Sequence, residues 1–420
     1  MLRLRFYLLI VFIFILIFPT QSFAQKLTLE RAIEEAVTRN PDLLKAEQEV
    51  GAAKAGFWEG VSPEYPEFFI EYEGIPEKSH SLSDYEEKKF GLTQGLDFPL
   101  AYFFKGQWHH FEKKRMEAEF LLLRNNLVSE VKKGFYRVIL LDRQTELYEE
   151  IARITRQNFQ KARVRVLAGE SSPYDTLKVK VDLAEVENRV LVMKRVLEVA
   201  RSELGLFLGR ERGEPVDVVG DLSFLPVSLN QDSLCELALA NHPSLMKAWA
   251  EVGQKSAKRR LSWTGLMPGI HLRYFRQEFP SEPSPRAWGG EIGVSVPLWF
   301  FLKGQGMIRS ASSELKAARW RVESERREVL LEVDQAFSRL IVAEKQVQNY
   351  RENTLREVEE LVRIATRSYE EGEMGYLEVA EAMRSLNRIQ VGYAEALFEY
   401  LAAQADLESA VGMTLSAIER

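Results

Sequence analysis

The stretch NPDLLKAEQEVG at residues 40–51 recurs as HPSLMKAWAEVG at residues 242–253, an offset of 202. Further matches follow in the same chain order: Pro99-Leu100 with Pro297-Leu298, Glu130-Val131 with Glu332-Val333, and Gly169-Glu170 with Gly372-Glu373, where the offset has become 203. Self-similarity over half of a chain is typical of a duplicated structural unit. The sequence therefore predicts two tandem copies of one fold.

Composition limits the class of protein and of partner. The 420 residues include 56 Lys and Arg against 62 Asp and Glu, which gives a net charge of −6. An acidic balance argues against nucleic acid as a partner. The single cysteine excludes an internal disulfide framework and any metal site built from several cysteines.

The N-terminus has the pattern of a cleaved signal peptide at residues 1–24. Arg3 and Arg5 precede an apolar run at residues 6–18, and the small residues Ser22 and Ala24 flank Phe23. After this segment no charge-free run reaches the roughly 18 residues that a membrane-spanning helix needs. We expect an exported protein that is not a helical inner-membrane protein, and strands of a membrane β-barrel stay possible.

Hydrophobic periodicity predicts a helix, a β-hairpin, a very long helix and a further helix in each half. In the last helices the apolar positions from Val179 to Phe207, and from Ala382 to Ala410, alternate steps of four and three, which predicts coiled-coil packing. Asn40-Pro41 predicts a break in the first helix. We expect these segments: a first repeat, 25–209 (hairpin 66–99, long helix 105–168, helix 171–209); a linker that crosses the middle of the structure, 210–230; a second repeat, 231–412 (hairpin 268–298, long helix 303–371, helix 373–412); and a tail, 413–420.

The hairpins show the opposite, two-residue periodicity. Strands with one apolar and one polar face are typical of a membrane β-barrel with a wet lumen, although soluble hairpins packed on helices could show the same pattern. Four strands cannot close a barrel, so closure needs an oligomer, and three chains would supply twelve strands. The positions that we expect to face lipid are Phe68, Ile70, Tyr72, Leu92, Ile270, Leu272, Ile292 and Val294.

A set of local motifs accompanies the duplication: Leu27-Thr28-Leu29-Glu30, Asn40-Pro41 with its echo Asn241-His242-Pro243, and the two Gly-Glu turns. With these motifs, residues 27–412 resemble the TolC-type outer-membrane efflux family of Gram-negative bacteria. The resemblance implies a mainly α fold with two small β-hairpins, and a homotrimer with a twelve-strand outer-membrane barrel and an α-helical barrel in the periplasm. It also implies a periplasmic adaptor (membrane fusion) protein and an inner-membrane pump of the RND or ABC type as partners. The compact size and the two Pro-Leu-x-x-Phe-x-Lys-Gly-Gln segments favour the heavy-metal or cation efflux branch, the CzcC- and CusC-like one.

The turns between the helices of each hairpin are the candidate functional sites. A structural role is sufficient to explain Gly169, Glu170, Gly372 and Glu373, because glycine commonly ends a helix and acidic residues commonly begin the next one. The resemblance assigns these four and Arg165 to an adaptor-contacting tip, and it assigns Asp175, Tyr369, Glu378 and Glu381 to a periplasmic gate.

Spacing adds an argument of its own for the two glutamates of this gate. Glu378 and Glu381 share one helix face and would form a charged ring if that face is luminal, although a solvated surface stays open as an alternative. Met374 stands where the best-known member carries arginine, so one closing link of the family is missing here.

No motif for catalysis or for a cofactor is present, and we expect no enzyme activity. The adjacent His109 and His110 would point about 100° apart on a helix, so they do not suggest a metal site. Two alternatives to an efflux duct for small molecules or metal ions stay open: a periplasmic coiled-coil adaptor or scaffold without a pore, and the exit duct of a type I protein secretion system. The sequence does not distinguish metal ions, drugs and proteins as cargo.

Overall fold

The computed structural model describes residues 26–78, 81–168, 172–280, 286–298, 304–371 and 373–415. They belong to two compact units. The first unit contains Met1–Asn40, Glu130–Pro226 and Val342–Ala402, and the second contains Pro41–Ser129, Val227–Ile341 and Ala403–Arg420. Each unit therefore takes segments from both halves of the chain. The predicted signal peptide lies outside the described residues.

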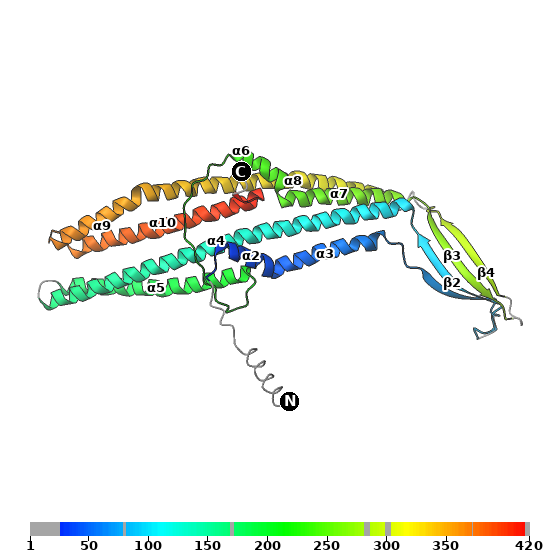
Figure 1. Ribbon diagram of the computed structural model, residues 1–420, viewed down its shortest axis with the longest axis horizontal. Helices are drawn as coiled ribbons and strands as arrows, with labels where there is room; N and C mark the ends of the chain where they lie inside the picture. Colours follow the sequence, from blue (N-terminus) through cyan, green and yellow to red (C-terminus); the bar gives the residue numbers. More distant parts are fainter. Residues whose placement is uncertain are drawn as a thin grey trace, which may run out of the picture. The chain divides into compact units, whose positions relative to one another are not determined.

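The two halves of the chain repeat one order of elements, as the duplication predicts (Figure 1). The first half has α2 (Leu29–Arg39), α3 (Pro41–Val61), β1 (Glu67–Glu73), β2 (Glu87–Leu96), α4 (Pro99–Leu167) and α5 (Pro173–Phe207). The second half has α6 (Gln231–Asn241), α7 (Pro243–Thr264), β3 (Gly269–Glu278), β4 (Arg286–Ser295), α8 (Gln305–Asn349), the π-helix η2 (Tyr350–Thr354), α9 (Leu355–Glu370) and α10 (Tyr376–Val411). No helix in the described ranges has a stretch that is both long and apolar enough to cross a membrane.

The predicted break at Asn40-Pro41 is confirmed and is stabilised by polar contacts. Asn40 leaves the helical conformation with a ψ of 122°, because the proline that follows disfavours it there. Its side-chain amide donates to the carbonyl of Phe207, 3.0 Å away, at the end of α5. His242 makes the equivalent break in the second half, with a ψ of 126° between α6 and α7, and its side chain accepts from the backbone N–H of Ser244.

The last helix of each repeat is followed by a glycine that lies against one of these breaks. Gly209 follows α5 with a φ of +72°, and Gly412 follows α10 with a φ of +77°. A Cβ on Gly209 would lie 2.5 Å from the carbonyl oxygen of Arg39, and one on Gly412 would lie 3.2 Å from that of Asn241. Both positions therefore require glycine, for the backbone conformation and for the close approach of the chain.

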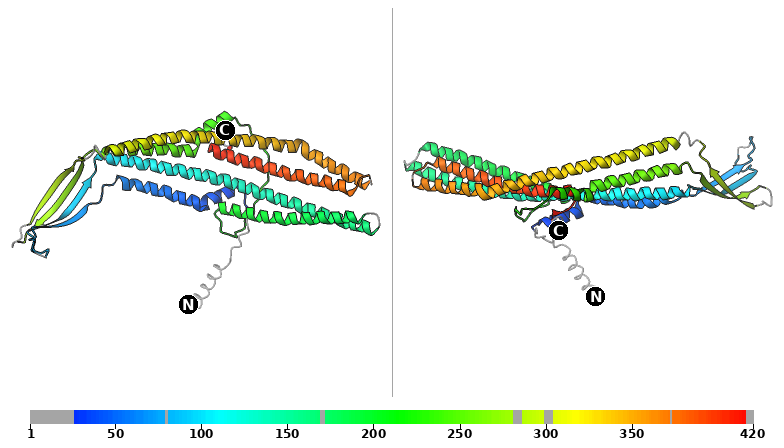
Figure 2. Two further views of the ribbon diagram at one scale, coloured as in Figure 1. Left: turned by 180° about the vertical axis from the view of Figure 1, so that it is seen from behind. Right: turned by 90° about the horizontal axis from the view of Figure 1, so that it is seen from above.

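The first unit contains two helical hairpins. The end of α4 runs beside α5, and α9 runs beside α10, in both views of the fold (Figures 1 and 2). Val131, Phe135 and Val138 are buried along α4, at the helical spacing that the sequence shows. Ala365, Val379 and Ala382 form a buried cluster between α9 and α10.

The second unit contains a four-stranded antiparallel sheet in the order β1-β2-β3-β4. Phe68 of β1 pairs with Leu92 of β2, which pairs with Tyr274 of β3, and this register continues without a bulge in the named strands. Side chains on directly opposed residues point to the same face of a sheet. The register therefore places the even-numbered residues of all four strands on one face and the odd-numbered residues on the other.

Candidate functional site

The turns of the two helical hairpins form the tip of the first unit, where the resemblance places the gate. Ser172 caps α5 by accepting from the backbone N–H of Tyr174, and Pro173 occupies the first helical position. After α9, the backbone N–H of Glu373 donates to the carbonyl of Ser368 at 2.8 Å. Gly169, Glu170 and Gly372 lie outside the described residues.

Arg165 and Tyr369 link the two hairpins at this tip. The guanidinium of Arg165, in the last turn of α4, donates a hydrogen bond to the phenol oxygen of Tyr369 on α9. The same guanidinium carbon lies 5.1 Å from the centre of the tyrosine ring, within the range of a cation–π contact. The resemblance assigns Arg165 to the adaptor contact and Tyr369 to the gate, and the structure brings these two residues together. Asp175 lies in the first turn of α5, and its side chain is outside the described part.

Glu378 and Glu381 lie at the start of α10, and both are exposed in the single chain. The Glu378 carboxylate turns back over Gly375, whose added Cβ would lie 3.0 Å from its Oε2 atom. Glu381 accepts from Arg384, 3.2 Å away and one turn further along α10. The two acids share a helix face, as their spacing predicts, and one of them has a basic partner.

Arg384 also joins the two hairpins, and sequence reasoning did not find it. Its second guanidinium nitrogen lies 2.9 Å from Asp182 on α5. The Asp182 side chain is 21% exposed, so this ion pair is partly shielded from water and is screened less than a surface pair. An arginine one turn after two acids is the only signal in the sequence, and it does not reveal the partner on α5.

The sheet of the second unit has one apolar and one polar face. All eight residues predicted to face lipid have even numbers and therefore lie on the same face, together with Phe90, Tyr274 and Trp288. Most of these side chains are exposed in the single chain, from 39% at Ile270 to 78% at Ile292. Tyr72 is half-buried.

The polar face is organised around Arg273 on β3. Its guanidinium lies 2.5 Å from a carboxylate oxygen of Glu71 on β1, 3.9 Å from Glu291 on β4, and 3.8 Å from the centre of the Phe69 ring. Glycine at position 91 of β2 lies between Phe69 and Phe275 in the register, and an added Cβ there would lie 2.0 Å from the carbonyl oxygen of Tyr274. A charged clamp across the sheet suits a wall that faces water.

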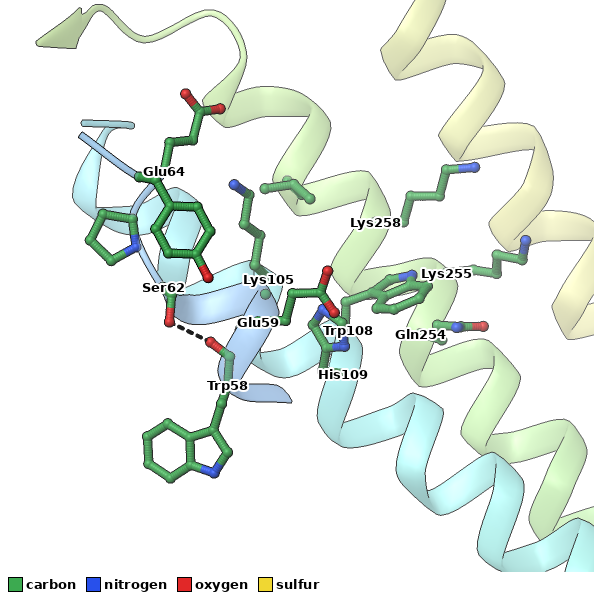
Figure 3. A pocket seen from close by; sticks show the side chains of 14 residues that line it. Trp58, Glu59, Ser62, Glu64, Lys105, Trp108, His109, Gln254, Lys255 and Lys258 are labelled. Atoms are coloured by element: carbon green, nitrogen blue, oxygen red, sulfur yellow. Dashed lines mark hydrogen bonds between the residues drawn. The ribbon is translucent and has the colours of Figure 1, made fainter. Parts of the chain in front are cut away.

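A groove of about 890 Å³ lies in the second unit between the end of α3, the start of α4 and α7 (Figure 3). The imidazole of His109 lies against Gly60, and burial lowers the pKa of His109, although Glu59 and Glu112 oppose this effect. Lys258 points toward α8, where it lies 2.8 Å from Glu314. The described residues contain no group of three or more His, Cys, Asp or Glu side chains that could hold a metal ion.

Known proteins resemble both the sequence and the fold. Residues 32–210 and 234–413 match the family model "Outer membrane efflux protein". The cobalt-zinc-cadmium resistance protein CzcC of Cupriavidus metallidurans is 24% identical over 401 residues, which cover 94% of this chain and 92% of CzcC. The crystal structure of CusC has a TM-score of 0.77 at 19% identity, with 92% of each chain covered. The CmeC outer membrane channel of Campylobacter jejuni has a TM-score of 0.79 at 13% identity, with 91% of this chain and 85% of that chain covered.

These matches support the efflux interpretation of the sequence and not the scaffold without a pore. The family model covers both halves of the duplication, and the solved relatives share the fold of long helices with one small sheet over most of the chain. This chain therefore belongs to the outer membrane efflux protein family and has the TolC-type fold.

Proposed function

We propose that three copies of this chain form an exit channel through the outer membrane. The two-faced sheet carries the proposal, because its exposed apolar face would contact lipid and its polar face would line the lumen. In the four-stranded sheet, β1 and β4 are edge strands. An unpaired strand edge is not viable in lipid, so pairing of β4 with β1 of the next copy would close twelve strands into a barrel.

The helices would form the periplasmic part of the channel, with the hairpin tips directed at the pump. The similarity to the cobalt-zinc-cadmium resistance protein supports divalent metal ions as cargo. We infer a passive duct that docks on a periplasmic adaptor and an inner-membrane pump, which supplies the energy. Arg165, the two Gly-Glu turns and the neighbouring residues of the tip are the proposed adaptor contact.

The gate would lie where the two hairpins of each chain meet. Glu378 and Glu381 would face the lumen, and the links from Arg165 to Tyr369 and from Arg384 to Asp182 would hold the tip closed. Asp175 is proposed to join this gate, as the resemblance implies. A trimer would bring together three copies of each charged group, which strengthens their effect on passing ions.

The apolar face offers a direct test of the channel proposal. Ile292→Asp would bury a carboxylate in lipid, which costs about 2–4 kcal/mol near the bilayer centre, so we expect loss of outer-membrane trimers. Ser295→Asp places the same charge on the polar face of the same strand and should leave assembly intact. The measurement is the amount of trimer in outer-membrane fractions. Normal assembly of Ile292→Asp would contradict the lipid-facing assignment.

Cargo is tested separately, in cells that express the chain with its adaptor and pump. We expect the complete set to lower the cellular content of zinc, cobalt or cadmium, and the loss of this chain alone to abolish the effect. Unchanged metal content together with export of organic compounds would contradict the metal assignment and leave the channel proposal standing.

A further inference from the structure

The buried positions along the long helix of the second half shift by one residue between Val347 and Val358. From Val329 to Val347 the buried side chains alternate steps of four and three, at positions 329, 333, 336, 340, 343 and 347. Continuing this alternation leads to positions 357 and 364. The buried residues are instead Val358 and Ala365, one position later. The second half therefore contains one extra residue in this interval.

In the first half the buried stripe continues without a shift up to Ala152, which corresponds to Thr354. Val131, Val138, Thr145 and Ala152 of α4 are buried at intervals of seven residues. The repeat offset agrees independently, because it is 202 at Glu130 and 203 at Gly169. The extra residue thus distinguishes the second hairpin from the first.

The π-helix at Tyr350–Thr354 absorbs this extra residue. The backbone N–H of Leu355 donates to the carbonyl of Tyr350, five residues earlier, and the Thr354 hydroxyl donates to the carbonyl of Asn349 at 3.4 Å. A wider turn lets one more residue enter a helix while the apolar stripe on both sides stays on one face. Such π-turns are rare in proteins, and many of those that occur lie at functional sites.

Gly392 of α10 makes room for this turn. The Tyr350 ring crosses it so closely that an added Cβ would lie 2.7 Å from the phenol oxygen. The equivalent positions of the first half are Tyr148 and Arg189, and there the guanidinium lies 5.6 Å from the ring centre. A tyrosine over glycine, beside a π-turn, thus replaces a tyrosine–arginine contact beside a regular α-helix.

The turn divides the contacts between the two hairpins into two groups. Tyr369 and Arg384 lie on the tip side of Tyr350 and Gly392, and they make the links to Arg165 and Asp182. Glu395 lies on the other side of Gly392 and accepts from Gln144 at 2.9 Å. Motion at the π-turn would therefore break the two tip links and preserve the third.

We propose that the π-turn Tyr350–Thr354, together with Gly392, is the hinge on which the tips of α9 and α10 move against the hairpin of α4 and α5. This inference rests on the proposed channel function. A turn with widened hydrogen bonds over a glycine bends more readily than the uninterrupted α4. The hinge gives the two halves of a duplicated chain different mechanical roles.

Deletion of Asn353 tests the hinge, because it removes one exposed residue and should restore a regular α-helix in register with the buried stripe. We expect the variant to assemble as wild type. Amide hydrogen exchange at residues 350–355 should slow at least about tenfold, and the open probability of reconstituted channels should fall about tenfold. Deletion of Glu150 from α4 is the matched control and should prevent assembly, because it shifts an unbroken stripe.

The outcomes separate the hinge from the channel proposal. If deletion of Asn353 abolishes assembly as deletion of Glu150 does, the residue is not an insertion and the inference fails. Slower exchange with a wild-type open probability would show that the turn does not control opening. Wild-type protein that conducts no ions would refute the channel proposal, whereas exchange at residues 350–355 no faster than at residues 148–152 would refute the hinge alone.

Discussion

At the residue scale, the tip combines contacts within one helix with contacts between the two hairpins. Helical spacing alone places Glu378 and Glu381 on one face, because that relation is local to α10. Arg384 is equally visible in the sequence, but its contact with Asp182 depends on how two hairpins pack. The family pattern likewise assigns Tyr369 to the gate but not its contact with Arg165, about 200 positions away in the chain.

Glu35 and Arg210 make the clearest case for pH dependence at the residue scale. The guanidinium of Arg210 binds both carboxylate oxygens of Glu35, at 2.7 and 2.8 Å, and only about one sixth of each side chain is exposed. This hydrogen bonding holds the pKa of Glu35 below its usual value, against the opposing effect of burial. The ionised form is therefore the one that stabilises the folded chain.

We predict that Glu35→Gln lowers the free energy of unfolding at pH 7 by about 2 kcal/mol. Because the folded pKa is depressed, the stabilisation by Glu35 is complete above the unfolded pKa of about 4.3 and is lost as the pH falls through the folded value. The wild type should therefore lose more stability than the variant below about pH 4.3. Thermal unfolding followed by tryptophan fluorescence at several pH values measures this, with the exposed Glu34→Gln as control. Parallel curves for wild type and Glu35→Gln would contradict the assignment.

At the scale of elements, features that local chemistry determines are easier to predict from the sequence than features that depend on long-range packing. The two-residue alternation is sufficient to assign the faces of the strands, because side chains of a strand alternate whatever its neighbours are. The break at Asn40-Pro41 follows from proline chemistry. The change of repeat offset indicates an insertion between residues 333 and 372, but its form as a π-turn depends on the packing of the stripe. The repeat boundaries and the 210–230 linker stay predictions.

The glycines that close each repeat give a prediction at this scale. Gly209→Ala should destabilise the chain by at least about 1–3 kcal/mol, because it adds backbone strain at positive φ and a clash with the carbonyl of Arg39. Gly412→Ala should cost less, since its nearest backbone atom would lie at 3.2 Å rather than 2.5 Å.

The control is Gly51→Ala, inside α3 and with no atom within 4 Å of an added Cβ. It should stabilise the helix by up to about 1 kcal/mol. Shifts in thermal unfolding measure all three variants. If Gly209→Ala were as stable as Gly51→Ala, the close contact between the end of α5 and the α2–α3 break would be absent.

At the scale of the whole molecule, function depends on what the single chain leaves uncovered. The exposed apolar face of the sheet and its two edge strands are costly in isolation and are stabilised only in lipid and by other copies. In the proposed channel the same would hold for the acids of the tip, because their effect on ions would depend on how many copies surround one axis. Oligomerisation thus converts local features of the sequence into the properties of a channel.

The last prediction concerns ion preference of the assembled channel. If Glu378 and Glu381 line the lumen, a trimer gathers six carboxylates near one level, and Arg384 partly neutralises the three from Glu381. The double substitution Glu378→Gln and Glu381→Gln should lower the preference for cations, whereas Arg384→Gln should raise it and increase opening, because it also breaks the link to Asp182. Reversal potentials across a salt gradient in planar bilayers measure preference, and Arg388→Gln on the same helix controls for loss of one positive charge. The double glutamate substitution and Arg384→Gln should shift the reversal potential in opposite directions only if these residues act at one luminal constriction. Unchanged reversal potentials in both variants would place the residues on an outer surface.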